Sequence, residues 1–168
     1  MLNKVVYLYK EKDMVKRIIK PPSSISFEQD NSVKVFLGGS IEMGKAENWQ
    51  ERVEKALDYT EKEFRIYNPR RDDWDSSWEQ TFENPQFSQQ VNWELNALEN
   101  SDIVIMYFDP NTKSPISLLE LGLYAKSGKL LVCCSDGFWR KGNVDIVCEK
   151  YNVPLFNSLE TLIKHIIN

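Results

Sequence analysis

The segment from Asp102 to Phe108 most constrains the fold of this chain, because it is a short and almost uninterrupted apolar run. Such a run is typical of a central parallel strand that is covered on both faces. Four more strand-like segments, with helical patterns between them, lie at residues 33–37, 64–67, 129–134 and 153–156. Strands and helices that alternate in this way predict an α/β fold, a doubly wound sheet of five mainly parallel strands with helices on both faces.

Helical spacing of apolar residues supports the same arrangement. It occurs at residues 46–59, 87–100, 144–151 and 159–166. In the second of these helices, the inward face is expected to carry Val91, Leu95 and Leu98, with Glu94 one position away from it. We therefore expect Glu94 at the edge of a pocket.

Residues 1–30 precede this alternation and are interpreted as an N-terminal extension. Residues 5–9 are expected to form a short strand, and residues 15–19 can pair with it before Pro21 and Pro22 end any regular element. The remaining residues, 31–168, are expected to form one α/β domain. A chain of 168 residues, of which 42% are hydrophobic, can bury one sizeable core.

Charge, cysteine content and histidine content narrow the function. A net charge of −4 argues against a nucleic-acid polymer or an anionic membrane as the main partner, and no apolar run approaches the roughly 18 residues that span a bilayer. Three cysteines, an odd number, and the lack of a secretory apolar region favour the cytoplasm. Because the single histidine, His165, lies among the last residues, we expect carboxylates to carry any catalysis, with no metal and no cofactor.

Glu120 is the only carboxylate in the otherwise apolar segment 114–125. Ser114 is a favourable N-cap and Pro115 a favourable first residue, so a helix is expected to start there and to carry Glu120 in its second turn. The apolar residues of this helix face nearly all round, which predicts a place inside the domain. A buried carboxylate is costly unless it is paired, protonated or used, so a structural ion pair and a functional site both remain open for Glu120.

Two loops offer candidate binding residues. The first, Gly38-Gly39-Ser40-Ile41, is a tight turn where the backbone can approach a ligand, although it lacks the dinucleotide-binding and Walker glycine patterns. The second, residues 68–78, contains two arginines and two tryptophans, namely Arg70, Arg71, Trp74 and Trp78. The tryptophans can stack on a nucleobase, form an oligomer interface or pin the loop to the domain, and the arginines can meet a phosphate or an acidic neighbour.

Three short motifs occur in a fixed order on the expected elements. They are the Gly-Gly-Ser-Ile turn, residues 92–98 (NWELNAL) with residues 101–104 (SDIV) behind them, and residues 119–125 (LELGLYA). Together they resemble the nucleoside 2-deoxyribosyltransferase family and its relatives that hydrolyse deoxynucleoside 5′-monophosphates, over residues 33–160. The resemblance implies a flavodoxin-like fold, a small nucleoside or nucleotide as partner, and a homo-oligomer whose subunits share active sites.

The resemblance also implies roles for individual residues. The glutamate of the family's Glu-Leu-Gly motif is the nucleophile, which corresponds to Glu120, and an acidic residue that handles the leaving base corresponds to Glu94, where the family usually has aspartate. Ser114 lies six residues before the nucleophile, where the transferases have a sugar-contacting aspartate and the monophosphate hydrolases a phosphate-contacting serine. Alternatively, Ser114 only caps its helix. Ser40 matches a further phosphate-contacting position of the hydrolases.

The predicted function is therefore that of an enzyme that cleaves the N-glycosidic bond of a 2′-deoxynucleoside or its 5′-monophosphate through a glycosyl-enzyme on Glu120, and passes the sugar to a base or to water. Such chemistry predicts two carboxyl groups about 5 Å apart, with Glu120 ionised and Glu94 at least partly protonated. A non-catalytic nucleotide-binding module and a flavin-binding domain remain as alternatives. The residues expected to bind substrate are Gly38, Gly39, Ser40, Ile41, Ser114, Ser117, Trp74, Trp78, Arg70, Arg71 and Trp93.

Overall fold

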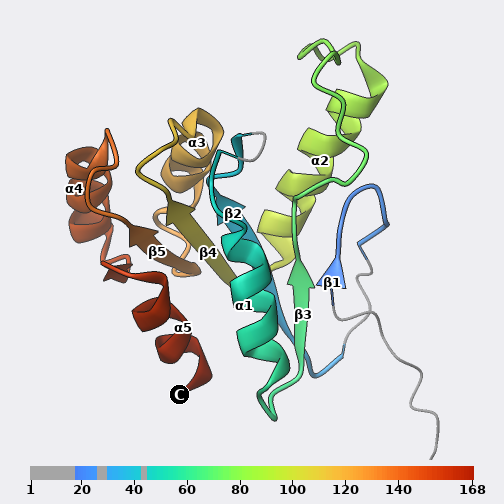
Figure 1. The fold of residues 1–168 in the computed structure, drawn as a ribbon. Helices are drawn as coiled ribbons and strands as arrows, with labels where there is room; N and C mark the ends of the chain where they lie inside the picture. Colours follow the sequence, from blue (N-terminus) through green and yellow to red (C-terminus); the bar gives the residue numbers. More distant parts are fainter. Residues whose placement is uncertain (1–17, 26–29, 43–44) are drawn as a thin grey trace, which may run out of the picture.

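The computed structural model describes residues 18–25, 30–42 and 45–168, which form one sheet with helices on both faces (Figure 1). All strand pairs of the sheet are parallel, and the strand order is β1-β3-β2-β4-β5-β6. The strands are β1 (Ile18–Ile19), β2 (Val33–Gly39), β3 (Phe64–Tyr67), β4 (Ile103–Phe108), β5 (Leu130–Cys134) and β6 (Leu155–Phe156). This is a doubly wound α/β fold of the flavodoxin-like type, as the alternation predicted.

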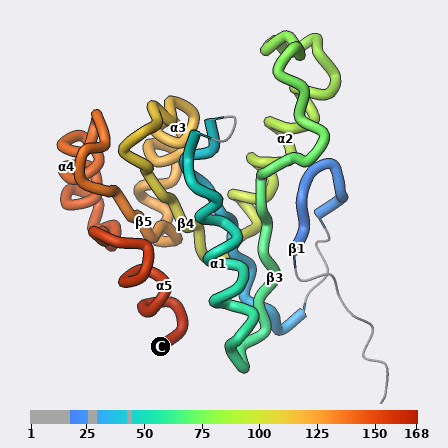
Figure 2. The backbone as a smooth tube through the Cα atoms, viewed as in Figure 1, coloured from blue at the N-terminus to red at the C-terminus, as the bar shows by residue number. Residues whose placement is uncertain are grey.

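The helices lie in two layers, one on each face of the sheet (Figure 2). The first layer contains α1 (Trp49–Asp58) and α5 (Leu159–Ile167), and the second contains α2 (Pro85–Asn100), α3 (Pro115–Tyr124) and α4 (Lys141–Tyr151). Apolar residues from each layer and from the sheet form two cores, with Trp49 and Leu162 in the first and Ala97 and Val144 in the second. Within the ranges that the structure describes, none of the helices is both long and apolar enough to cross a membrane.

The sheet has one strand more than the five expected. The additional strand, β1, pairs in parallel with β3, so that Ile18 lies opposite Ile66. The strand expected at residues 5–9 lies outside the described residues. The division into residues 1–30 and 31–168 stays a prediction, although β1 belongs to the same sheet as the strands that follow.

The inward face of α2 differs from the expected one. Its buried residues are Gln90, Trp93, Ala97 and Leu98, whereas the side chain of Leu95 is 40% exposed. The indole of Trp93 donates a hydrogen bond to the carbonyl of Ser23 at 2.8 Å and packs edge-on against Tyr67. These long-range contacts set the rotation of the helix, and short-range apolar spacing cannot reveal them.

The expected burial of α3 was wrong. Ile116, Leu119 and Leu123 are about 60% exposed. The buried side carries Ser117, Glu120 and Leu121. The helix therefore presents an apolar ridge, defined as Ile116, Leu119 and Leu123, on the surface of the described chain.

The carboxyl ends of β2 and β4 lie side by side at the centre of the sheet, at the point where the strand order reverses. Gly39 has φ = +125°, and a Cβ there would lie 2.3 Å from the carbonyl oxygen of Tyr107, so only glycine lets the two strands approach this closely. The amide of Ser40 then donates to the same carbonyl at 2.8 Å. Ligands of such sheets bind in the crevice beyond these strand ends.

Candidate active site

A cavity of about 580 Å³ is lined by residues of the carboxyl end of β2 and of α2 and α3. Figure 1 shows these two helices beyond the carboxyl ends of β2 and β4. Of the residues predicted to form the site, those that line the cavity are Gly38, Gly39, Ile41, Trp74, Glu94, Ser114, Ser117 and Glu120. The sequence interpretation did not include several others, among them Phe36, Glu42, Pro69, Phe87 and Gln90. The topology thus brings residues from four separate segments to one hollow.

Glu94 is held from one side by Gln90, its neighbour one helical turn earlier. Gln90 Nε2 donates to Glu94 Oε1 at 2.8 Å and to the carbonyl oxygen of Pro69 at 3.0 Å. A carbonyl oxygen only accepts hydrogen bonds, so the amide nitrogen must face both partners, and Oε1 of Glu94 serves as an acceptor. When Glu94 carries a proton, that proton therefore lies on Oε2.

Burial raises the pKa of Glu94 to about 7, although the hydrogen bond from Gln90 acts in the opposite direction. Burial also raises the pKa of Glu120 to about 8, and the negative charge of Glu94 adds to this effect. The two carboxyl groups therefore hold about one proton between them near neutral pH. The order of the two pKa values is the reverse of the expected one, because Glu94 has a hydrogen-bond donor that stabilises its charged form.

Glu120 is 7% exposed, and within the described part of the chain no lysine, arginine or histidine forms an ion pair with it. The structural ion pair that the sequence left open is therefore absent among these residues. An unpaired buried carboxyl group destabilises a fold in its charged form, so it favours protonation or a function.

Ser114 occupies the N-cap position of α3, but its side chain makes no cap hydrogen bond, so this alternative was wrong. Its backbone is left-handed (φ = +47°), and its hydroxyl lies 2.7 Å from Ser40 Oγ and 2.8 Å from Thr112 Oγ1. Ser40 Oγ also accepts from the amide of Asp109 at 2.9 Å. This hydroxyl cluster, Ser40, Thr112 and Ser114, joins the loops that follow β2 and β4; Ser40 itself is fully buried.

The loop at residues 68–78 contributes Trp74 to the cavity wall. Trp78 packs edge-on against Trp74, with ring centroids 5.2 Å apart, and the guanidinium of Arg71 lies 4.9 Å from the centre of the Trp78 ring. Arg71 also forms an ion pair with Asp73 at 2.8 Å. Trp74 therefore lies at the cavity and Trp78 packs against it, while the stacking and anchoring roles considered for both tryptophans stay predictions.

Two other predicted binding residues lie away from the cavity wall. Arg70 Nε donates to Gln50 Oε1 at 2.8 Å, and the Arg70 guanidinium also donates to the carbonyl of Glu47, so this arginine ties its loop to α1. Trp93 is buried in the core, where its indole meets Ser23. Neither Arg70 nor Trp93 lines the cavity.

Glu42 is the site residue that sequence reasoning missed most completely. Its Oε1 accepts hydrogen bonds from the backbone amides of Lys113 and Ser114, the latter at 2.6 Å. These amides are far away in the sequence, and only the position of Glu42 directly after the Gly-Gly-Ser-Ile turn hinted at a role. Gln90 had a clearer signal, because it precedes Glu94 by four residues on one helix.

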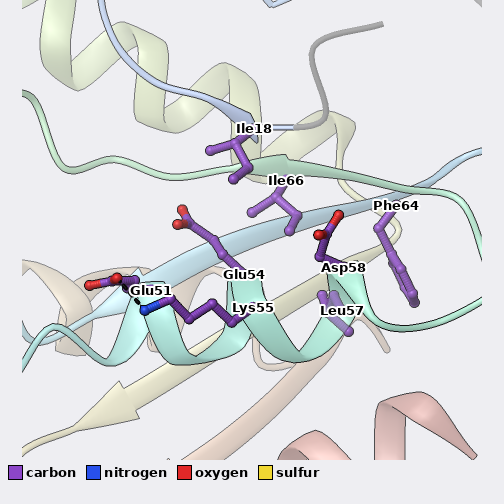
Figure 3. A pocket seen from close by; sticks show the side chains of 8 residues that line it. All are labelled: Ile18, Glu51, Glu54, Lys55, Leu57, Asp58, Phe64 and Ile66. Carbon is purple, nitrogen blue, oxygen red and sulfur yellow. Dashed lines mark ion pairs between the residues drawn. The ribbon is translucent and has the colours of Figure 1, made fainter. Parts of the chain in front are cut away.

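A second cavity, of about 350 Å³, lies between α1 and the edge of the sheet at β1 and β3 (Figure 3). Its walls combine Ile18, Phe64 and Ile66 with carboxylates of α1. Glu51 forms an ion pair with Lys55 at 2.6 Å, and this hydrogen bond lowers the pKa of Glu51. Glu94 and Glu120, the glutamates with raised pKa values, line the first cavity, which makes it the candidate active site.

Comparison with known proteins adds one match to this geometry. A family model described as nucleoside 2-deoxyribosyltransferase like matches residues 32–138. The matched range begins just before β2 and extends past β5, so it contains both carboxyl groups and the loops that close the cavity. No curated protein matches the chain.

Proposed function

The chain belongs to the nucleoside 2-deoxyribosyltransferase-like family, and we propose that it cleaves the N-glycosidic bond of a 2′-deoxynucleoside or its 5′-monophosphate. The observation that carries the proposal is the pair Glu94 and Glu120, two carboxyl groups with raised pKa values that line one cavity. Breaking a glycosidic bond through an oxocarbenium-like state needs one carboxylate and one carboxylic acid. Two carboxyl groups that share one proton supply one carboxylate and one carboxylic acid.

In the first step, the Glu120 carboxylate attacks C1′ of the sugar while the bond from C1′ to the base nitrogen breaks. Glu94 Oε2 gives its proton to the leaving base, which departs neutral, and the sugar remains as an ester of Glu120. In the second step, a second base or a water molecule attacks C1′, its proton passes to Glu94, and the Glu120 carboxylate is released. The choice between base and water decides between transfer and hydrolysis.

The reactive form requires the shared proton on Glu94 and the charge on Glu120. Substrate binding favours this form, because a developing positive charge at C1′ stabilises an anionic Glu120 next to it. Ring atoms of Trp74 offer a flat apolar face for the base, and Ser117, on the same face of α3 as Glu120, offers a hydroxyl to the sugar. No metal or cofactor is part of the proposal.

We also propose a homo-oligomer, with a second copy of the chain seated on the apolar ridge Ile116, Leu119 and Leu123. These residues are about 60% exposed and also line the cavity at its rim. Exposed apolar patches next to a site are typical of interaction surfaces. A copy bound there would close the rim and keep water away from the glycosyl-enzyme.

The pKa order in the cavity supports a second candidate, a nucleotide-binding module without turnover. If Glu120 keeps the proton when a nucleoside binds, it is a poor nucleophile. Such a protein would bind nucleosides or nucleotides and release no free base.

Base release measured by chromatography tests the proposal. Wild type, Glu120→Gln and the control Glu61→Gln, an exposed glutamate in the turn after α1, are each incubated with deoxynucleosides and their 5′-monophosphates, with and without a second base. We expect release by wild type and Glu61→Gln, and a loss of about 10³-fold or more in Glu120→Gln. An exchanged nucleoside identifies transfer. Tight binding of substrate by folded wild type without release would support the binding module instead.

A further inference from the structure

We propose that Glu42 determines the specificity of the site, because its carboxylate occupies the place where a 5′-phosphate would bind. The substrate then carries a free 5′-hydroxyl group. The inference rests on the proposed function and narrows its substrate class from nucleosides and nucleotides to nucleosides.

The first line of evidence is an anion-binding arrangement that the protein fills by itself. The amides of Lys113 and Ser114 both donate to Glu42 Oε1. Successive amides that converge next to a left-handed residue, at the start of a helix, form a concave binding site for an anion. Ser114 is that left-handed residue, and α3 begins directly after it. The Glu42 carboxylate therefore occupies these two amides.

The second line of evidence is the position of Glu42 in the cavity. Glu42 and Ser114 both line it, together with Glu120. Ser114 precedes Glu120 by six residues, which corresponds to about 9 Å along a helix axis. That separation suits a sugar whose C1′ faces Glu120 and whose 5′ end points toward Ser114 and Glu42.

The third line of evidence is the hydroxyl cluster. In this chain Ser40 and Ser114 lie 2.7 Å apart and both contact Thr112, whose hydroxyl donates to the carbonyl of Asp109. Their hydrogen-bonding capacity is used to join two loops, and Ser40 is fully buried beneath them.

Charge then decides between the two substrate classes. A 5′-phosphate would bring about two negative charges against the Glu42 carboxylate and would compete with it for the same two amides. A 5′-hydroxyl is neutral and can donate a hydrogen bond to a carboxylate oxygen. Glu42 also adopts a left-handed backbone (φ = +37°), which is uncommon for a residue with a long side chain. Its two amide hydrogen bonds hold this conformation, in which the carboxylate reaches across to α3.

The activity test compares kcat/KM for a deoxynucleoside and its 5′-monophosphate in wild type, Glu42→Gln, Glu42→Ala and the control Glu61→Ala. Wild type and the control should favour the nucleoside. In both Glu42 variants the ratio should shift toward the monophosphate by about tenfold or more, through a gain on the monophosphate. The glutamine variant keeps the side-chain volume, so it separates the loss of charge from any change in the loop. A wild type that favours the monophosphate, or a ratio unchanged in both variants, would overturn the proposal.

A binding test without catalysis distinguishes this inference from the proposed function. Thermal unfolding is measured with inorganic phosphate and with chloride at equal ionic strength. Phosphate should stabilise Glu42→Ala and Glu42→Gln specifically, and it should leave wild type and Glu61→Ala at their chloride values. If no substrate is cleaved but phosphate stabilises only the Glu42 variants, the proposed enzyme is wrong and the role of Glu42 stands. Phosphate that stabilises wild type equally, or no variant at all, would refute the role of Glu42.

Discussion

Glu94 on α2 and Glu120 on α3 line one cavity, and burial together with the negative charge of Glu94 raises the pKa of Glu120. The two residues come from helices that are separated in the chain by the central strand β4. Because the two carboxyl groups share a proton, the rate of cleavage should depend on pH and on the leaving base, and the free energy of unfolding should depend on pH. Each of these dependences leads to a prediction.

The pH dependence of kcat/KM should be bell-shaped, with limbs near pH 7 and pH 8 and a maximum between them. Below the first limb both carboxyl groups are protonated and the nucleophile is lost, and above the second limb both are ionised and the acid is lost. Initial rates of base release from pH 5.5 to 9.5 provide the measurement. A profile that is flat across this range would show that the ionisation of Glu94 and Glu120 does not control catalysis.

Glu120→Gln should stabilise the fold at high pH. The pKa of Glu120 rises from 4.5 to about 8 on folding, so the folded protein binds more protons than the unfolded chain between these values, and the wild-type free energy of unfolding falls as pH rises through this window. Glutamine has no charge to bury, so the variant should exceed wild type by ~2–4 kcal/mol at pH 9 and lie near it at pH 4.5.

Urea unfolding of both proteins at the two pH values measures this difference. Glu61→Gln, which removes an exposed glutamate, should show no comparable dependence on pH. An equal effect of Glu120→Gln at both pH values would mean that Glu120 does not titrate in the folded protein with a raised pKa.

Glu94→Gln should slow the cleavage of substrates with poor leaving bases most strongly. A base that leaves readily as an anion needs little protonation, whereas a poor leaving base depends on the acid by about 10²-fold or more. Rates for a series of nucleosides whose bases differ in pKa test this, because the slope of log rate against base pKa should steepen in the variant. A uniform decrease across the series would indicate a structural role for Glu94.

Trp74→Ala and Trp78→Ala should have different effects on substrate affinity. Trp74 lines the cavity, so its loss should raise KM by about tenfold, which is typical of a lost stacking contact with a base. Trp78 contacts Trp74 and Arg71, so its loss should weaken the loop and have a smaller effect on KM. Equal KM values for Trp74→Ala and wild type would indicate that both tryptophans only anchor the loop to the domain.

Leu119→Lys should reduce the oligomeric state, because it places a charge at the centre of the apolar ridge. The matched control is Ile146→Lys on α4, where the isoleucine is 68% exposed and lies outside the ridge. Light scattering coupled to size-exclusion chromatography gives the mass of each species. A monomeric wild type, or a loss of mass in both variants, would argue against an interface on α3.

The sequence by itself determined the type and the order of the secondary-structure elements from residue 33 onward. Continuous apolar runs and helix start signals arise from neighbours within one segment, so the strand at 102–108 and the helix that carries Glu120 could be recognised without a structure. The same reasoning singled out Glu120, because a carboxylate in an apolar segment is anomalous wherever that segment lies. It also predicted a site beyond the strand ends, since that follows from a doubly wound sheet.

Only the tertiary structure decided which sides of α2 and α3 are buried and which groups meet. The orientation of α2 depends on the contact of Trp93 with Ser23, and the exposure of the α3 ridge depends on which side of that helix packs on the sheet. The contact of Glu42 with Lys113 and Ser114, which bridges about 70 positions of the chain, leaves no local pattern of apolar spacing. Contacts between distant segments are selected by packing and by the satisfaction of buried polar groups, and these act only once the sheet has brought the loops together.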